Sequence, residues 1–151
     1  MGGSAYIDGI EYKEFDNFYQ IPFQIKNKYW TSSEQSYQAL KFDDEEHVEK
    51  IRNETDLSMI IHLGHVTYIK YVDGWDNELV SSKLKINPFK THSKINLMYI
   101  VNLEKFRQNP NIRKLLIQTS GVIKCSGSTR FWNKWNSLIL EKIRSELKSA
   151  S

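Results

Sequence analysis

The sequence predicts an α+β domain that is rich in helices and carries a small antiparallel β element near its N-terminus. Three observations favour this class. The first thirty residues alternate between polar and apolar positions and are rich in aromatic and β-branched residues, which is typical of short strands. Beyond Ser32 the apolar residues recur mostly at helical spacing. The sequence lacks the glycine-rich phosphate loop that would indicate a parallel βαβ array. The order of strands followed by helices therefore favours the α+β class.

The length of the chain suits one domain. A domain of 151 residues can bury a hydrophobic core without disulfides or a structural metal. We expect a single domain over residues 5–149. We expect residues 1–4 to be an added remnant outside it, because Gly2-Gly3-Ser4 has the character of a cloning scar.

The N-terminal part predicts short strands and a hairpin. Tyr6–Ile10 and Phe23–Ile25 alternate in polarity, and Lys26-Asn27 forms a turn before Tyr29-Trp30. The helices predicted beyond this part begin near Ser32 and cover Asp44–Arg52, Asp56–Leu63 with Gly64 as a left-handed cap, Ser93–Arg107, Asn109–Gly121 and Leu138–Leu147.

The remaining segments are less regular. Val66–Val72 has the composition of a strand, and Asp73-Gly74 that of a turn. Val122–Cys125 is a further candidate strand, and Ser126–Asn133 is expected to be a loop.

Composition and charge exclude several classes. Hydrophobic residues make up 40% of the chain, and no apolar run approaches the roughly 18 residues that span a bilayer, which excludes a transmembrane protein. A single cysteine, Cys125, cannot form an internal disulfide, and the N-terminal residues lack the basic-then-apolar pattern of a secretory leader, so we expect a cytoplasmic, intracellular protein. The net charge of +3 is spread out, so it permits a phosphate-bearing ligand without indicating nucleic-acid binding.

The segment from Thr31 to Phe42 holds the main candidate for chemistry. At about 100° per residue, Glu34, Gln38 and Lys41 lie within a narrow arc of one helix, with Tyr37 at its edge. This pattern is typical of a polar working face over an apolar support. Taken alone, the helix more often indicates a solvated face or a capping box, since Thr31-x-x-Glu34 and Ser32-x-x-Gln35 both have the capping-box spacing, and both interpretations stand.

A collinear series of motifs resembles the YbiA-like NADAR family over residues 15–147. The matching pieces are Phe15–Tyr19, Pro22-Phe23, Trp30–Phe42, Leu63-Gly64, Lys94 with Met98, Lys105–Arg113, Leu115–Thr119 and Phe131-Trp132. The resemblance implies the family's helix-rich α+β fold. It also implies an N-glycosidase that acts on ADP-ribosylated guanine in DNA or RNA, or alternatively on phosphoribosylated intermediates of riboflavin synthesis.

The resemblance also implies the site residues. By matched position Glu34 is the catalytic carboxylate, and Lys41 and Asn17 belong to the active-site pocket. The further residues that we expect to bind an ADP-ribose-containing or phosphoribosyl substrate are Phe18, Tyr19, Tyr37, Gln38, Trp75, Arg130 and Trp132. No cofactor, metal or membrane is expected to take part.

The chemistry explains why such residues are needed. Breaking a C1′–N bond builds positive charge on the ribose, which a nearby carboxylate such as Glu34 stabilises. Lys41 can hold a phosphate or a sugar hydroxyl, or attack an opened ribose aldehyde as a neutral amine. Trp75 offers an aromatic plane on which a base stacks, or equally a buried anchor, and Arg130 suits a phosphate or simply an exposed loop.

The chain departs from the family pattern near Phe131. The family usually carries an acid two positions before its Phe-Trp-Gly, whereas this chain has Thr129 there and Asn133 in place of the glycine. The missing acid leaves a non-catalytic ADP-ribose or nucleotide-binding module as an alternative. The family also carries an active-site tryptophan. Because of an insertion of about fifteen residues, over 76–92, its position in this chain corresponds either to Trp75 or to the region of Phe89.

Two residue types carry weaker signals. His62 and His65 lie three apart, but no third ligand of suitable spacing accompanies them, so a helix-end role is favoured over zinc binding. Cys125 lies in an apolar strand without a neighbouring histidine, so we expect a core residue and not a nucleophile.

Overall fold

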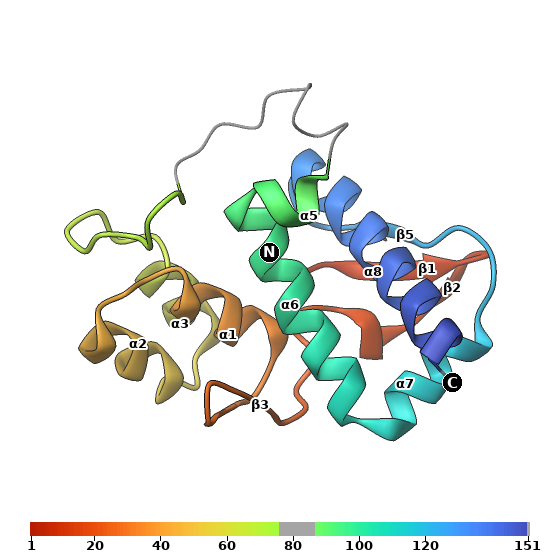
Figure 1. The fold of residues 1–151 in the computed structure, drawn as a ribbon, viewed down its shortest axis with the longest axis horizontal. Coiled ribbons are helices and arrows are strands. Elements are labelled where there is room, and N and C mark those ends of the chain that lie inside the picture. Colours follow the sequence, from red (N-terminus) through yellow and green to blue (C-terminus); the bar gives the residue numbers. More distant parts are fainter. Residues whose placement is uncertain (76–86, 151) are drawn as a thin grey trace. The chain divides into compact units, whose positions relative to one another are not determined.

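The computed structural model describes residues 1–75 and 87–150, and they form an α+β fold (Figure 1). The chain divides into two compact units, which are described separately. Unit 1 joins Met1–Glu34 to the segment that begins at Val101, and unit 2 is Gln35–Ile100. Helices α1 (Ser33–Leu40) and α6 (Ser93–Gln108) contribute residues to both units.

Unit 1 contains a three-stranded antiparallel sheet in the order β2-β1-β5, formed by β1 (Ser4–Ile7), β2 (Ile10–Glu11) and β5 (Lys124–Ser126). The turn between β1 and β2 places Asp8 at φ 51° and Gly9 at φ 79°, the geometry of a type I′ hairpin. The prediction of one alternating segment over Tyr6–Ile10 is therefore wrong, because this Asp-Gly turn interrupts it. The β element is also not purely N-terminal, since β5 pairs with β1.

A second hairpin in unit 1 confirms the sequence prediction. β3 (Phe23–Ile25) pairs with β4 (Lys28–Trp30), and Phe23 lies opposite Trp30. Lys26 and Asn27 have φ of 55° and 62°, so both turn residues adopt the left-handed conformation that a type I′ turn requires. Phe23 and Trp30 are buried, which fixes the register of the hairpin on the core side.

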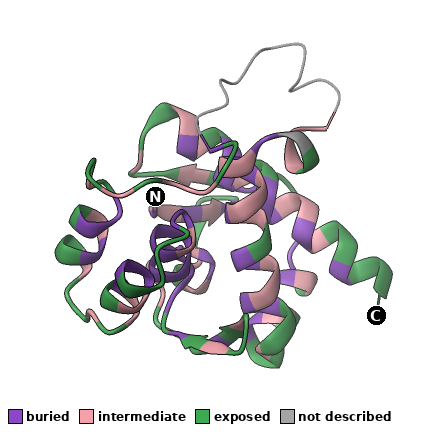
Figure 2. Ribbon diagram, turned by 60° about the vertical axis from the view of Figure 1, so that its left-hand side comes forward, coloured by how far each residue is buried: buried purple, intermediate pink, exposed green. Residues whose placement is uncertain are grey.

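The helices of unit 1 pack around this β structure. They are the short 3₁₀ helix η1 (Lys13–Phe15), the second half of α6, α7 (Pro110–Gln118) and α8 (Arg130–Ala150). α8 packs beside β5 and α7, and its C-terminal end is largely exposed (Figures 1 and 2). The predicted helix over Ser93–Arg107 and the break at Asn109-Pro110 are confirmed.

α8 begins at Arg130, not at the predicted Leu138, so the loop expected over Ser126–Asn133 is wrong in its second half. Thr129 caps the helix: its Oγ1 accepts a hydrogen bond from the Trp132 backbone nitrogen at 3.2 Å. The residues from Thr129 to Trp132 show no apolar periodicity, so the pattern that predicted the helix could not reveal its start. In the structure the start is marked by the Thr129 cap.

Unit 2 contains most of α1, together with α2 (Glu45–Arg52), α3 (Leu57–Leu63), α5 (Pro88–Thr91) and the first half of α6. The Asp44 carboxylate accepts from the His47 backbone nitrogen at 2.9 Å, and Asp56 accepts from that of Ser58 at 2.8 Å. Both aspartates therefore act as N-caps, which confirms α2 and α3. Among the helices within residues 1–75 and 87–150, none is both long and apolar enough to cross a membrane.

The strand predicted over Val66–Val72 is wrong. The segment is irregular, with bends over residues 67–69, and Tyr71 forms an isolated antiparallel bridge with Phe42. The predicted turn at Asp73-Gly74 is confirmed. Of the insertion predicted over 76–92, residues 76–86 lie outside the described residues, and α5 begins at Pro88.

Gly64 follows α3 for a reason different from the predicted one. Its φ is −72° and its ψ is −11°, so it is right-handed and the predicted left-handed cap is wrong. A Cβ at this position would lie 2.0 Å from Oε1 of Gln38. Gly64 is therefore required by the close approach of the buried Gln38 side chain, and any larger residue overpacks this contact.

Gly64→Ala is expected to lower the free energy of unfolding by about 1–3 kcal/mol, because the new methyl group forces Gln38 aside. Chemical denaturation measures the loss. Made in a Gln38→Ala background, the same substitution is expected to cost clearly less. An equal cost in both backgrounds would contradict this explanation.

Candidate active site

Glu34 lies in the first turn of α1 and is completely buried, with 0% of its surface exposed. The interpretation of its helix face as solvated is therefore wrong. The Glu34 backbone nitrogen donates to the Asn17 carbonyl at 2.9 Å, and its Oε2 accepts from the Met1 α-amino group at 2.5 Å. The positive end of the α1 dipole further stabilises a carboxylate at this position.

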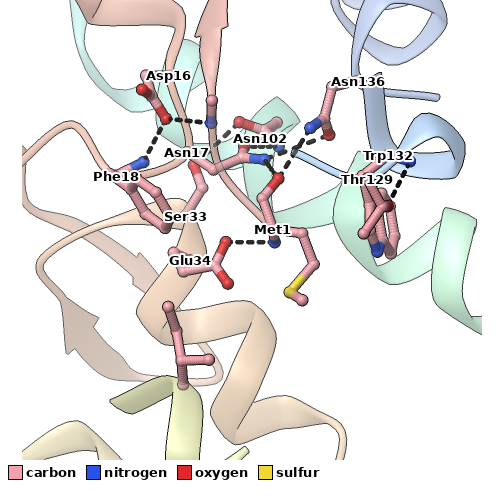
Figure 3. Close-up of polar contacts among 12 residues, drawn as sticks. Met1, Asp16, Asn17, Phe18, Ser33, Glu34, Asn102, Thr129, Trp132 and Asn136 are labelled. Atoms are coloured by element: carbon pink, nitrogen blue, oxygen red, sulfur yellow. Dashed lines mark hydrogen bonds and ion pairs between the residues drawn. The ribbon is translucent and has the colours of Figure 1, made fainter. Parts of the chain in front are cut away.

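Three asparagines form a hydrogen-bonded network beside Glu34 in unit 1 (Figure 3). Ser33 Oγ donates to Asn102 Oδ1 at 2.9 Å, and Asn102 Nδ2 donates to Asn17 Oδ1 at 2.8 Å. Asn17 Nδ2 in turn donates to Asn136 Oδ1 at 3.2 Å. We call Asn102, Asn17 and Asn136 the asparagine network; all three side chains are buried, so their mutual bonds replace hydration.

The network ends at the backbone of Met1. The Met1 carbonyl oxygen accepts from Asn17 Nδ2 at 3.1 Å and from Asn136 Nδ2 at 2.9 Å. Met1 thus contacts the carboxylate of Glu34 through its nitrogen and two amides through its oxygen (Figure 3). The expectation that residues 1–4 are an added remnant stays a prediction, although Ser4 belongs to β1.

The turn that carries Asn17 is fixed from two sides. Asp16 Oδ1 accepts from the backbone nitrogens of Gly3 and Phe18, each at 3.0 Å. Lys105 Nζ donates to the Asp16 carbonyl at 2.9 Å and lies 5.7 Å from the centroid of the Tyr19 ring. Asn17 therefore reaches the network from a turn whose neighbours on both sides are held in place.

Lys105 is a fully buried lysine that sequence reasoning did not assign to the site. It is 0% exposed, and burial lowers its pKa from 10.5 to about 7, opposed by the carboxylates of Asp16 and Glu14. The centroid of the Phe106 ring lies 5.2 Å from Lys105 Nζ, closer than that of Tyr19. The ammonium form is thus held by a carbonyl and two ring faces at a cost in desolvation.

The other unit 1 residues predicted for the site lie at the start of α8. Trp132 is buried with its ring 5.1 Å from that of Phe131, and Arg130 is exposed at the first position of the helix. Thr129 occupies the position of the missing family acid and caps α8. An aspartate caps a helix as well as a threonine does, so the substitution preserves the local structure while removing a carboxylate.

Unit 2 holds the remaining predicted residues: Tyr37 and Trp75 lie around the buried Lys41, and the buried Gln38 side chain lies against Gly64. Lys41 Nζ lies 5.6 Å from the Tyr37 ring centroid, 5.4 Å from that of Tyr71 and 6.0 Å from that of Trp75. The Trp75 ring is buried and tilted against both tyrosines at 5.8 Å. Lys41 therefore sits in an aromatic cluster, and Tyr71 is a member that the sequence did not reveal.

The two weaker candidates have ordinary surroundings. His65 is exposed, with its Nδ1 2.7 Å from the Ile61 carbonyl, and no group of three potential metal ligands occurs within the described residues. Burial raises the pKa of the Cys125 thiol to about 11, opposed by a hydrogen bond with Ser137. The thiolate of Cys125 is thus scarce at neutral pH, which disfavours nucleophilic chemistry.

Comparison with known proteins identifies the family. The model of the NADAR domain matches residues 6–136, which is most of the chain. The chain belongs to the NADAR domain family. The resemblance found in the motifs is thereby confirmed.

Individual relatives in the NADAR family are more distant. The N-glycosidases YbiA of Escherichia coli (strain K12) and Shigella sonnei (strain Ss046) are each 27% identical over 97 residues, which is 63% of this chain. The match spans 61% of the length of each relative. The NMR structure of the E. coli protein YbiA superimposes with a TM-score of 0.72 at 22% identity, covering 96% of this chain and 83% of that one. This likeness confirms the α+β NADAR fold.

Lys105 generates a pH-dependent prediction. Because its folded pKa of about 7 lies below its ordinary value of 10.5, the unfolded chain binds the extra proton between these values, and stability rises with pH across that window. The free energy of unfolding of the wild type, relative to Lys105→Met, is expected to increase by about 3 kcal/mol from pH 7 to pH 10. Urea titrations at several pH values measure this difference; a difference that is flat with pH would contradict the buried charge.

Proposed function

We propose that this NADAR protein is an N-glycosidase that hydrolyses the C1′–N bond of ADP-ribosylated guanine in nucleic acid. The observation that carries the proposal is the fully buried Glu34 carboxylate beside the asparagine network. A buried carboxylate costs several kcal/mol in desolvation, and function is a common reason for retaining one. The relatives that bear the name N-glycosidase YbiA support the same reaction class.

The reaction breaks the bond between the ribose C1′ and the base nitrogen, and the bonding electrons leave with the base. Positive charge then develops on the ribose ring, as in glycoside hydrolysis. Glu34 stabilises this charge or removes a proton from the attacking water, because a carboxylate in a water-poor site interacts strongly with an adjacent cation. The water oxygen joins C1′, and its proton reaches the departing base.

Thr129 increases the dependence of the proposed reaction on Glu34. In the family pattern an acid stands at that position, but here Thr129 supplies a hydroxyl already committed to the Trp132 backbone nitrogen. Glu34 is therefore the carboxylate to which we assign the charge stabilisation. The net charge of +3 suits a substrate that carries a pyrophosphate.

Glu34→Gln is expected to reduce the release of ADP-ribose from guanosine-ADP-ribosylated DNA by about 10²–10³-fold, because it removes the negative charge and keeps the side-chain volume. Chromatography of the released ADP-ribose measures the rate. Glu146→Gln, which changes an exposed glutamate on α8, is the matched control and is expected to retain full activity.

The same assay separates the alternatives. Hydrolysis of phosphoribosylated pyrimidine intermediates but not of ADP-ribosylated guanine would favour the riboflavin-type substrate. Tight binding of ADP-ribose without turnover by the wild type would favour a binding module. Turnover by Glu34→Gln at the wild-type rate would refute the role of Glu34 itself.

Lys41 provides a second test of the chemistry. If its amine condenses with the aldehyde of an opened ribose, the imine formed with loss of water is reducible by cyanoborohydride to a stable adduct on Lys41. Mass spectrometry of the trapped protein is expected to locate the adduct on Lys41, and Lys41→Met is expected to yield none. Lys70→Met, at an exposed lysine, is the control and is expected to leave trapping unchanged.

A further inference from the structure

The contacts of Met1 define a binding site for two neighbouring polar atoms in unit 1. Its nitrogen donates to Glu34 Oε2, while its carbonyl oxygen accepts from both Asn17 and Asn136. A carbonyl oxygen only accepts hydrogen bonds, so both amide nitrogens face it. The site therefore offers an acceptor, Glu34, beside two converging N–H donors.

The donor-to-acceptor direction of the hydrogen bonds in the asparagine network sets this arrangement. Because Asn17 Nδ2 also donates to Asn136 Oδ1, the Asn136 amide is oriented with its nitrogen toward Met1. Asn102 Nδ2 fixes the Asn17 oxygen on the opposite side at 2.8 Å. Asn17 and Asn136 thus use their oxygens within the network and present their nitrogens to the site, so the donors are preorganised.

The spacing of the two Met1 atoms matches a sugar diol. The nitrogen and the carbonyl oxygen of one residue are separated by three bonds, N–Cα–C–O, and so are the two oxygens of a vicinal diol, O–C–C–O. One hydroxyl of such a diol can donate to Glu34 while the neighbouring oxygen accepts from the two amides. A sugar that makes these contacts displaces Met1 from them.

We infer that Asn136, together with Asn17, binds one hydroxyl of the substrate's cis-diol while Glu34 accepts from the other, so that the site selects ribosyl over deoxyribosyl compounds. This inference rests on the proposed N-glycosidase function and adds the residues that recognise the ribose of its substrate. Hydrogen bonds to the hydroxyl beside the anomeric carbon strengthen as a glycosidic bond breaks. A site that binds the diol therefore also contacts the hydroxyl beside the reacting carbon.

The test compares ligands and variants in one cycle. Isothermal titration measures the binding of ADP-ribose and of its 2′-deoxy and 3′-deoxy forms, altered in the distal ribose, to the wild type, Asn136→Ala and the isosteric Asn136→Asp. Asn111→Ala, at an exposed asparagine on α7, is the matched control. Thermal melts confirm that each variant is folded.

The wild type is expected to bind each deoxy form about tenfold more weakly than ADP-ribose. Both Asn136 variants are expected to lose about tenfold for ADP-ribose but nothing for the deoxy form that lacks the hydroxyl bound by Asn136. Equal losses for all three ligands, no discrimination by the wild type, or no binding of ADP-ribose would overturn the inference.

Binding and turnover separate this inference from the proposed function. A wild type that releases ADP-ribose from modified guanine yet binds all three ligands equally would overturn the diol site and leave the N-glycosidase standing. A wild type that discriminates the diol but cleaves no N-glycosidic bond would overturn the enzyme and leave the diol site.

Discussion

The burial of the Glu34 carboxylate is the constraint on which much of unit 1 depends. A charge without solvent must be compensated by hydrogen-bonded or charged neighbours. Here the Met1 α-amino group bonds the carboxylate, and the Met1 carbonyl is held in turn by the asparagine network. The network draws on distant parts of the sequence, since Asn17 follows η1, Asn102 lies on α6 and Asn136 on α8. Each of these side chains is buried as well, so each requires the others. Met1 thus joins the buried carboxylate to a network of buried amides that aligns several elements.

Local sequence signals predicted those parts of the fold that local chemistry determines. The Lys26-Asn27 turn and the Asp44 and Asp56 caps follow from residues within a few positions of one another. The pairing of β1 with β5 joins segments more than a hundred residues apart, and a three-residue strand carries too little periodicity to predict its partner. Gly64 was predicted correctly as a helix end but for the wrong reason, because the crowding by Gln38 is a tertiary contact.

The residues of the candidate site likewise divide into those that sequence motifs predicted and those that only tertiary contacts revealed. Family motifs pointed to Glu34 and Asn17, whereas Asn102, Asn136 and Lys105 emerged only from the structure. For Asn136 the sequence did contain a signal. It lies four positions after Trp132 and three before Ile139, on the buried stripe of α8. A polar residue on an apolar stripe requires a buried partner. The sequence cannot name that partner, because the register between α8 and the turn at Asn17 is set by packing.

The threonine at position 129 links the stability of α8 to the chemistry of the site. An N-cap contributes on the order of 1 kcal/mol and accepts Asp, Asn, Ser or Thr with little difference. Replacing an acid by Thr129 is therefore nearly neutral for the helix, as its bond to the Trp132 nitrogen shows. For catalysis the same exchange removes a negative charge. Thr129 thus satisfies the cap but supplies no carboxylate, and the dependence of the proposed reaction on Glu34 and on the amides that position its substrate is correspondingly greater.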